Sequence, residues 1–176
     1  SEAGEAAMQF NDAVIAGNVF TMLLAGEDTT ANTLSWMLHY MALHPEVQRK
    51  MQAEADQVLG ANRTLTDLRD ADNLTYIEAV ANEAMRLRPV SPIFAAEPIV
   101  DVELAGVQIP AGTLLFMLAR PALWDEQNFA HAHAFRPERW LAGNGCPFHG
   151  PHNRSIHVPF GNGPRICLGR GLALLE

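Results

Sequence analysis

A short segment near the C-terminal end of the chain constrains the fold more than any other. It runs from Phe160 to Gly169, reads Phe-Gly-Asn-Gly-Pro-Arg-Ile-Cys-Leu-Gly, and places Cys167 directly ahead of a predicted helix. A thiolate near neutral pH is stabilised by the free backbone N–H groups and the positive dipole end of a helix N-terminus. Glycines let the backbone approach a flat ligand closely. The pattern therefore predicts a loop that holds a thiolate-ligated metal cofactor.

The residues around the cysteine favour a site with restricted water access. Phe160, Ile166 and Leu168 are apolar, which would tune the potential of a bound metal, and Arg165 stands two residues before the cysteine. The alternative is a small buried cysteine in a glycine-rich turn, since free cysteines are usually inert and buried. The complete pattern Phe-x-x-Gly-x-Arg-x-Cys-x-Gly is far more specific than an isolated glycine motif. It resembles the haem-binding loop of the cytochrome P-450 family, the haem-thiolate monooxygenases.

The composition indicates a globular protein that does not bind nucleic acid. The 176 residues suffice for one domain with a core, and 48% hydrophobic with 18% charged residues excludes a disordered chain. Twelve basic and twenty acidic residues give a net charge of −8 without a basic cluster. Two cysteines, Cys146 and Cys167, form no disulfide framework and favour a reducing compartment.

The absence of a basic or apolar surface signal favours a cytoplasmic protein, which among cytochromes P-450 would be the soluble bacterial type. No stretch reaches the roughly 18 apolar residues that a membrane span needs, and the chain starts without a signal peptide. An upstream membrane anchor stays open, because the chain does not begin with Met and we expect it to be truncated at both ends.

The first half of the chain is predicted to be helical. The proline-free segment from Glu2 to Leu43 predicts one long helix. A second helix is expected over 46–59, after Pro45, and a third over about 73–87, with Asp72 or Asn73 as its cap.

The second half is predicted to contain short strands and a long loop. Residues 99–118 are rich in Val, Ile and Leu and are interrupted by Gly and Pro, which indicates short strands with turns between them. Residues 129–158 are irregular and polar, which is typical of a functional or disordered loop. A last helix is expected to begin at Cys167 or Leu168.

A second motif, Ala-Gly-Glu-Asp-Thr-Thr at residues 25–30, lies inside the predicted long helix. Gly26 and the threonines are unfavourable there, and threonine hydroxyls can bond to the preceding turn. Ala25 and Gly26 leave a shallow groove for a ligand, and Asp28 and Thr29 place an acid beside a hydroxyl, which suits proton relay. The alternative is a polar stripe on a half-exposed helix. The motif resembles the family's oxygen-activation motif, with Asp28 as the acid and Thr29 as the hydroxyl.

A charge pair forms the third motif. Glu83 and Arg86 are spaced i,i+3 on one face of a mostly apolar helix, so we expect them to be partly buried. A buried pair needs a further partner, and Arg139, in the segment Pro-Glu-Arg-Trp, is the candidate. Glu-x-x-Arg followed by Pro-Glu-Arg-aromatic resembles the family's structural charge triad. The resemblance implies that these residues hold the haem loop in place and do no chemistry.

The motifs occur in the family's order, and the resemblance covers essentially the whole chain. We therefore expect a mainly α fold with a small β-sheet region, of the cytochrome P-450 type. Residues 1–176 would be a partial haem-binding domain, the C-terminal haem-side half without the N-terminal half and the last helix and strands.

The resemblance also implies a cofactor, haem b (iron protoporphyrin IX), with Cys167 as the axial ligand of the iron. Arg165 would anchor a propionate, because the region where many relatives carry another arginine reads Ala-Ala-Glu at residues 95–97. Ile93 and Phe94 would line the substrate pocket, although ordinary core residues leading into a strand fit them equally. The cofactor-binding residues implied are Ala25, Gly26, Phe160, Gly163, Arg165, Cys167 and Gly169.

A zinc site is a weaker alternative for the long loop. Cys146, His149, His152 and His157 are the donors, but their spacing fits no standard closed site. Solvated histidines explain the pattern better, and the role of Cys146 and of the loop from His131 to His157 stays open.

The implied activity is insertion of one oxygen atom from O₂ into a small apolar substrate. Electrons would come from NAD(P)H through a ferredoxin or a flavoprotein reductase, either separate or fused. Two alternatives remain, a peroxide-driven hydroxylase or isomerase on the same scaffold, and an inactive fragment, because the family has further chain that forms much of the pocket.

Overall fold

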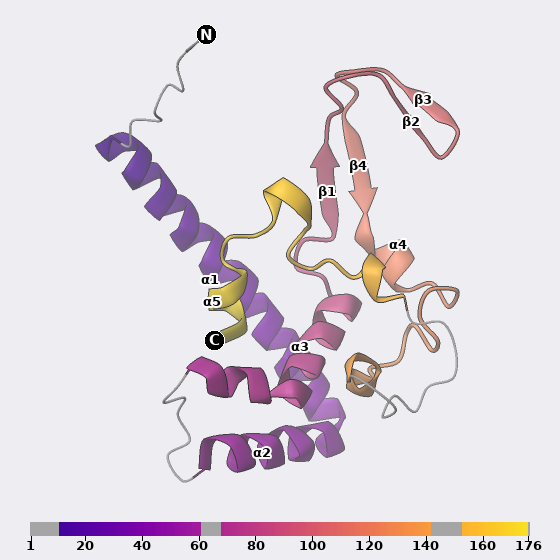
Figure 1. Ribbon diagram of the computed structural model, residues 1–176. Coiled ribbons are helices and arrows are strands. Elements are labelled where there is room, and N and C mark those ends of the chain that lie inside the picture. The colour runs from indigo at the N-terminus through magenta and orange to yellow at the C-terminus, as the bar shows by residue number, and fades with distance from the viewer. Residues whose placement is uncertain (1–10, 61–67, 142–152, 176) are drawn as a thin grey trace.

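The longest element is helix α1, Asp12–Leu43, which runs diagonally across the molecule (Figure 1). The computed structural model describes residues 11–60, 68–141 and 153–175. The side chain of Asn11 caps α1 by accepting a hydrogen bond from the N–H of Val14 at 3.0 Å. The predicted helix through Leu43 is confirmed over the described residues, and its first ten positions lie outside them.

Helices α2, Pro45–Leu59, and α3, Thr75–Leu87, pack against the C-terminal half of α1 (Figure 1). Both are confirmed within a residue or two. The predicted cap of α3 is wrong, because Asp72 and Asn73 lie in the 3₁₀ helix η2, Leu68–Asn73, and make no side-chain cap.

A carboxylate from the neighbouring helix takes the place of that cap. Glu54 of α2 accepts hydrogen bonds from the N–H groups of Tyr76 at 2.7 Å and Ile77 at 2.8 Å. These are first-turn donors of α3, which have no partner within their own helix. The contact therefore joins α2 to the start of α3.

The main core lies where the three helices meet the segment after residue 130. It contains Tyr76, Val80, Ala84 and Leu87 of α3, together with Met37, Val47 and Phe135. A second, smaller cluster contains Leu123, Phe129 and Ala132. Burial of these side chains fixes α3 between α1 and the C-terminal segments.

Two two-stranded antiparallel sheets form the β region. Strands β1, Ile93–Ala96, and β4, Leu115–Leu118, pair with Phe94 opposite Met117. Strands β2, Val102–Leu104, and β3, Val107–Ile109, pair around a tight turn at Ala105 and Gly106, both with positive φ. The strands expected over 99–118 are confirmed, and β1 was not expected.

The remaining described residues form short helical turns joined by loops. They are α4, Ala119–Leu123; η3, Pro137–Trp140; η4, Arg154–Ile156; η5, Gly163–Arg165; and α5, Arg170–Leu175. Helix α5 begins later than the predicted Cys167 or Leu168. The mainly α class with a small β region is confirmed, and none of the described helices is long and apolar enough to cross a membrane.

Candidate functional site

The loop before α5 is closed by its own backbone around Cys167. The N–H of Cys167 donates to the carbonyl of Phe160 at 2.8 Å, which brings the two ends of the loop together. Gly161 and Gly163 have φ of +73° and +69°, a region that side chains other than glycine rarely adopt. The side chain of Asn162 accepts a hydrogen bond from the N–H of Gly163 at 2.8 Å. The glycines are therefore needed for the loop to close.

The thiol of Cys167 is free and exposed. Its apolar neighbours Ile166 and Leu168 are 42% and 97% exposed, so within the described residues they do not shield the sulfur as the sequence suggested. A Cβ on Gly169 would lie 3.8 Å from the sulfur, which places this glycine directly beside it. Arg165 is also exposed and makes no ion pair among the described residues. The loop thus presents a thiol, a guanidinium and apolar surface on its outside.

The second motif lies on an open stretch of α1. Thr29 donates its hydroxyl proton to the carbonyl of Ala25 at 2.7 Å, the back-bonding that the sequence predicted. Asp28 and Thr29 are exposed, and the helix continues through Gly26 without a break. Apart from the helix itself, no described atom lies within 4 Å of a Cβ placed on Gly26. The structure therefore leaves the space beside Gly26 open, and no described atom of the cysteine loop lies within 4 Å of that position.

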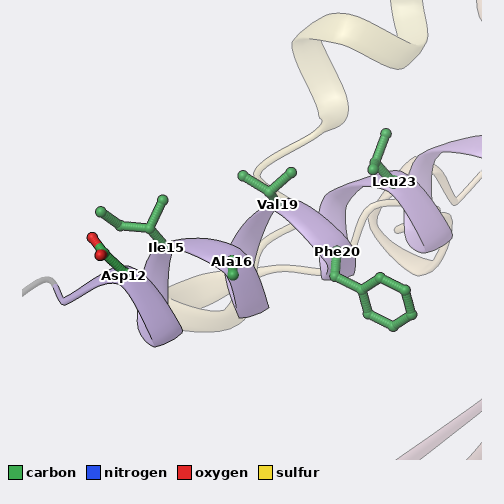
Figure 2. Close-up of a pocket in the computed structure, with 6 residues that line it drawn as sticks. All are labelled: Asp12, Ile15, Ala16, Val19, Phe20 and Leu23. Atoms are coloured by element: carbon green, nitrogen blue, oxygen red, sulfur yellow. The ribbon is translucent and has the colours of Figure 1, made fainter.

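The first turns of α1 carry an exposed apolar surface. Figure 2 shows Ile15, Val19 and Leu23 projecting from one side of the helix and the ring of Phe20 from another side. These four side chains are 48 to 66% exposed. Large exposed apolar surfaces mark contact sites for a ligand or another part of a protein.

The three charged residues of the third motif come together and are completely buried. Glu83 and Arg86 have 0% exposure and Arg139 has 1%. Glu83 Oε1 accepts from Arg86 Nη2 at 2.8 Å and from Arg139 Nε at 3.1 Å. The structure therefore joins α3 to η3 through one carboxylate.

Two further hydrogen-bond donors reach Glu83, and neither was predicted from the sequence. The N–H of Arg136 donates to Oε1 at 2.9 Å, and the indole N–H of Trp140 donates to Oε2 at 2.9 Å. Trp140 belongs to the same Pro-Glu-Arg-Trp segment, and a buried indole N–H usually finds an acceptor, which is a signal that could have identified it.

Backbone carbonyls satisfy the remaining guanidinium donors. Arg86 Nη1 donates to the carbonyls of Leu123 and Ala132, both at 2.7 Å, and Arg139 Nη1 donates to that of Ala130 at 3.1 Å. Burial lowers the pKa of Arg139 and the adjacent Glu83 carboxylate opposes that shift, but an arginine stays charged in either case. The cluster therefore holds two cations and one anion and fixes the loop between residues 123 and 139.

Next to the cluster, Glu138 connects α2, α3 and η3. Its Oε1 lies 2.6 Å from Lys50 Nζ and accepts from the hydroxyl of Tyr76 at 3.0 Å. Burial would raise the pKa of Glu138, but the hydrogen bonds, chiefly that from Lys50, hold it below its ordinary value. Burial and the Glu138 charge together raise the pKa of Tyr76.

The sequence as a whole matches one family. The family model described as Cytochrome P450 matches residues 1–176. This chain belongs to the cytochrome P-450 family.

Relatives from distant organisms match this chain over most of its length. Cytochrome P450 4V2 of Mus musculus is 35% identical over 162 residues, which cover 92% of this chain and 30% of the relative. Cyclooctat-9-en-7-ol 5-monooxygenase of Streptomyces melanosporofaciens is 34% identical, covering 100% of this chain and 37% of the relative. A solved zebra fish cytochrome P450 with progesterone has a TM-score of 0.75 and 33% identity, over 88% of this chain and 34% of that one. The chain spans about a third of the length of these relatives.

The cytochrome P-450 family implies haem, and the cysteine loop fits it. A thiolate ligand must be free of disulfide and reachable, and Cys167 is both. The exposed side chain of Leu168 next to the cysteine offers apolar surface for a porphyrin face, and the exposed Arg165 is available for a carboxylate of the cofactor.

Ile93 and Phe94, the predicted pocket residues, lie on β1. Ile93 is 52% exposed, and Phe116 and Met117 of the paired strand β4 are 64% and 48% exposed. The β1–β4 strand pair therefore offers apolar surface, as a cytochrome P-450 substrate pocket would need. The pocket assignment stays a prediction.

The zinc alternative gains no support from the described residues. They contain no group of three His, Cys, Asp or Glu side chains that could hold a metal ion. Cys146, His149 and His152 lie outside them. His157 packs instead against Trp140, with 4.6 Å between the ring centroids.

Proposed function

We propose that this chain is the haem-side part of a monooxygenase that inserts one oxygen atom from O₂ into a small apolar substrate. The observation that carries the proposal is the free, exposed Cys167 in a backbone-closed loop that matches the haem loop of the cytochrome P-450 family. Thiolate-ligated haem supplies the chemistry, because the thiolate donates electron density that favours O–O cleavage. Electrons would come from NAD(P)H through a ferredoxin or flavoprotein reductase.

In this proposal Cys167 holds the iron and Arg165 binds a haem propionate through a charge-assisted hydrogen bond. The Gly161 and Gly163 conformations keep side chains away from the cofactor side of the loop. Gly169, beside the sulfur, leaves room for the same purpose. These roles are the ones that the resemblance to the family's haem loop implies.

Asp28 and Thr29 would deliver protons on the opposite side. The hydroxyl of Thr29 donates to the carbonyl of Ala25, so its oxygen lone pairs are available to accept a proton. Passing a proton onward requires rotation of this hydroxyl away from Ala25. The exposed carboxylate of Asp28 makes no hydrogen bond to another described residue, so it can exchange protons with solvent.

Exposed apolar side chains support an apolar substrate. They occur on α1, at Val19, Phe20 and Leu23, and on the paired strands β1 and β4, at Ile93 and Met117. Apolar walls with few polar groups are the usual lining of pockets for small apolar molecules.

The test uses the full-length protein, reduced and treated with carbon monoxide. Wild type and Cys146→Ala should both show the red-shifted Soret band of thiolate-ligated haem, while Cys167→Ala should lose it. Persistence of the band in Cys167→Ala would refute the ligand assignment. Product formation with peroxide alone, and none with NAD(P)H and a redox partner, would favour the peroxide-driven alternative.

A further inference from the structure

A tryptophan connects the buried charge cluster to the segment that leads into the cysteine loop. The indole N–H of Trp140 donates to Glu83 Oε2 at 2.9 Å. The ring of Trp140 lies against that of His157, with 4.6 Å between centroids and 46° between planes. Three residues after His157, the carbonyl of Phe160 accepts the hydrogen bond from the N–H of Cys167. A continuous set of contacts thus runs from the cluster to the thiol.

The surroundings of Trp140 make this connection important for the loop. Trp140 packs against the second core cluster together with Ile156, and its ring centroid lies 6.3 Å from that of Phe129. A cavity separates the loop from α3, and its lining includes Asn82 of α3 and Phe160 of the loop. Trp140 and His157 also line this cavity. Trp140 therefore contacts α3 through Glu83 and the segment before the loop through His157.

The hydrogen bond and the packing together fix the orientation of the ring. An indole has a single N–H, so one bond to an immobile acceptor sets the direction of that N–H, and packing beside Phe129 restricts rotation of the ring about it. Glu83 is such an acceptor, because it is completely buried and takes four further hydrogen bonds from arginine side chains and backbone. A phenylalanine at position 140 would keep an aromatic contact without this constraint.

We propose that Trp140 is a positioning residue for Cys167, which acts through His157 on the backbone of residues 157–160. The proposal rests on the proposed function, since the position of the thiol matters there as the position of an iron ligand. Trp140 thereby joins the charge cluster without neutralising a charge. Its role is to connect Glu83 to the position of the loop.

The experiment compares Trp140→Phe with Trp124→Phe in the full-length protein. Trp124 is a matched control, because its indole N–H also makes a hydrogen bond, to the carbonyl of Leu87 at 3.2 Å, and its ring lies against His133 rather than His157. Hydrogen exchange of the Cys167 amide reports the loop directly. Transfer of haem to an excess of a haem-scavenging protein reports the ligation.

Trp140→Phe should speed both processes by about tenfold, the effect of losing a hydrogen bond to a charged group, with unchanged helix content. Trp124→Phe should leave both within about twofold, because the hydrogen bond that it removes goes to the carbonyl of Leu87 and not to Glu83. The effects of Trp140→Phe and His157→Ala should not add in the double variant, because the first removes the hydrogen bond to Glu83 and the second removes the ring contact, and both interrupt the same route from Glu83 to the loop.

Three results would overturn the proposal or separate it from the proposed function. Equal exchange of the Cys167 amide in the Trp140 and Trp124 variants removes the positioning role. Additive effects of the Trp140 and His157 variants remove the route through His157. Absence of the thiolate band in wild type refutes the haem ligation instead, and the amide exchange then still decides whether Trp140 orders the loop.

Discussion

Replacing Glu83 with glutamine removes the one negative charge at the centre of the buried cluster and keeps the side-chain volume. Arg86 and Arg139, 0% and 1% exposed, would then have no counter-ion within the cluster. Their hydrogen bonds to backbone carbonyls remain, but carbonyl dipoles do not replace a full charge in a buried site. The substitution therefore isolates the electrostatic contribution of the carboxylate.

The hydrogen-bond geometry adds a second cost. Oε2 accepts from Arg86 Nε and Trp140 Nε1, whereas Oε1 accepts from Arg86 Nη2, Arg139 Nε and the N–H of Arg136. An amide has one acceptor oxygen, so even its better orientation turns an NH₂ group toward two donors. Breaking a buried ion pair on one side costs about 3–5 kcal/mol. That is a large part of a total stability of roughly 5–15 kcal/mol.

Urea unfolding followed by tryptophan fluorescence measures this loss. We expect a lower midpoint for Glu83→Gln with an unchanged slope. Glu138→Gln is the control, because Glu138 is 22% exposed and has one charged partner, Lys50, so its loss should cost about 0–1 kcal/mol. Equal losses in the two variants would show that burial of the cluster does not set its energy, which would refute the reasoning.

Three further predictions concern the proton relay, the cap of α3 and the response to acid. Thr29→Ala should lower the amount of product formed per NAD(P)H by roughly tenfold and raise peroxide release. Thr33→Ala, which removes a similar hydrogen bond to the preceding turn, should change neither. An equal ratio of product to NAD(P)H in the two variants would exclude the relay. Glu54→Ala should lower the free energy of unfolding by about 1 kcal/mol, because two first-turn donors of α3 lose their acceptor, and an unchanged urea midpoint would contradict this. Because the pKa of Glu138 lies below its ordinary 4.5, its pair with Lys50 stabilises the fold above that pH and loses its effect as the pH falls through the lowered value. Unfolding midpoints measured between about pH 6 and 3 should therefore fall less steeply in Glu138→Gln than in wild type.

The helices were predictable because their signals are local. Pro45 at the start of α2 and Gly60 after its end mark that helix in the sequence, and the end of α3 is marked by Pro89. The cap of α3 could not be read in the same way. Its acceptor, Glu54, comes from the preceding helix, and no local rule connects residues more than twenty positions apart.

In the candidate site too, some features could be predicted from the sequence and others could not. The resemblance identified Glu83, Arg86 and Arg139, and the structure joins them in one buried cluster. It gave no role to Trp140, since a hydrogen bond to Glu83 depends on which way the ring points. The exposure of Leu168 was also missed, because a sequence shows that a residue is apolar and not what covers it.

The meeting of Glu83 with Arg139 also has a consequence for the time course of refolding. The two residues are 56 positions apart, so their encounter requires closure of a long segment, whereas α1 and α3 form from neighbouring residues. The loop from Phe160 to Cys167 is connected to this ion pair through Trp140 and His157. We therefore expect helical circular dichroism to recover early after dilution from urea, and the capacity to capture porphyrin to return in a later, slower phase.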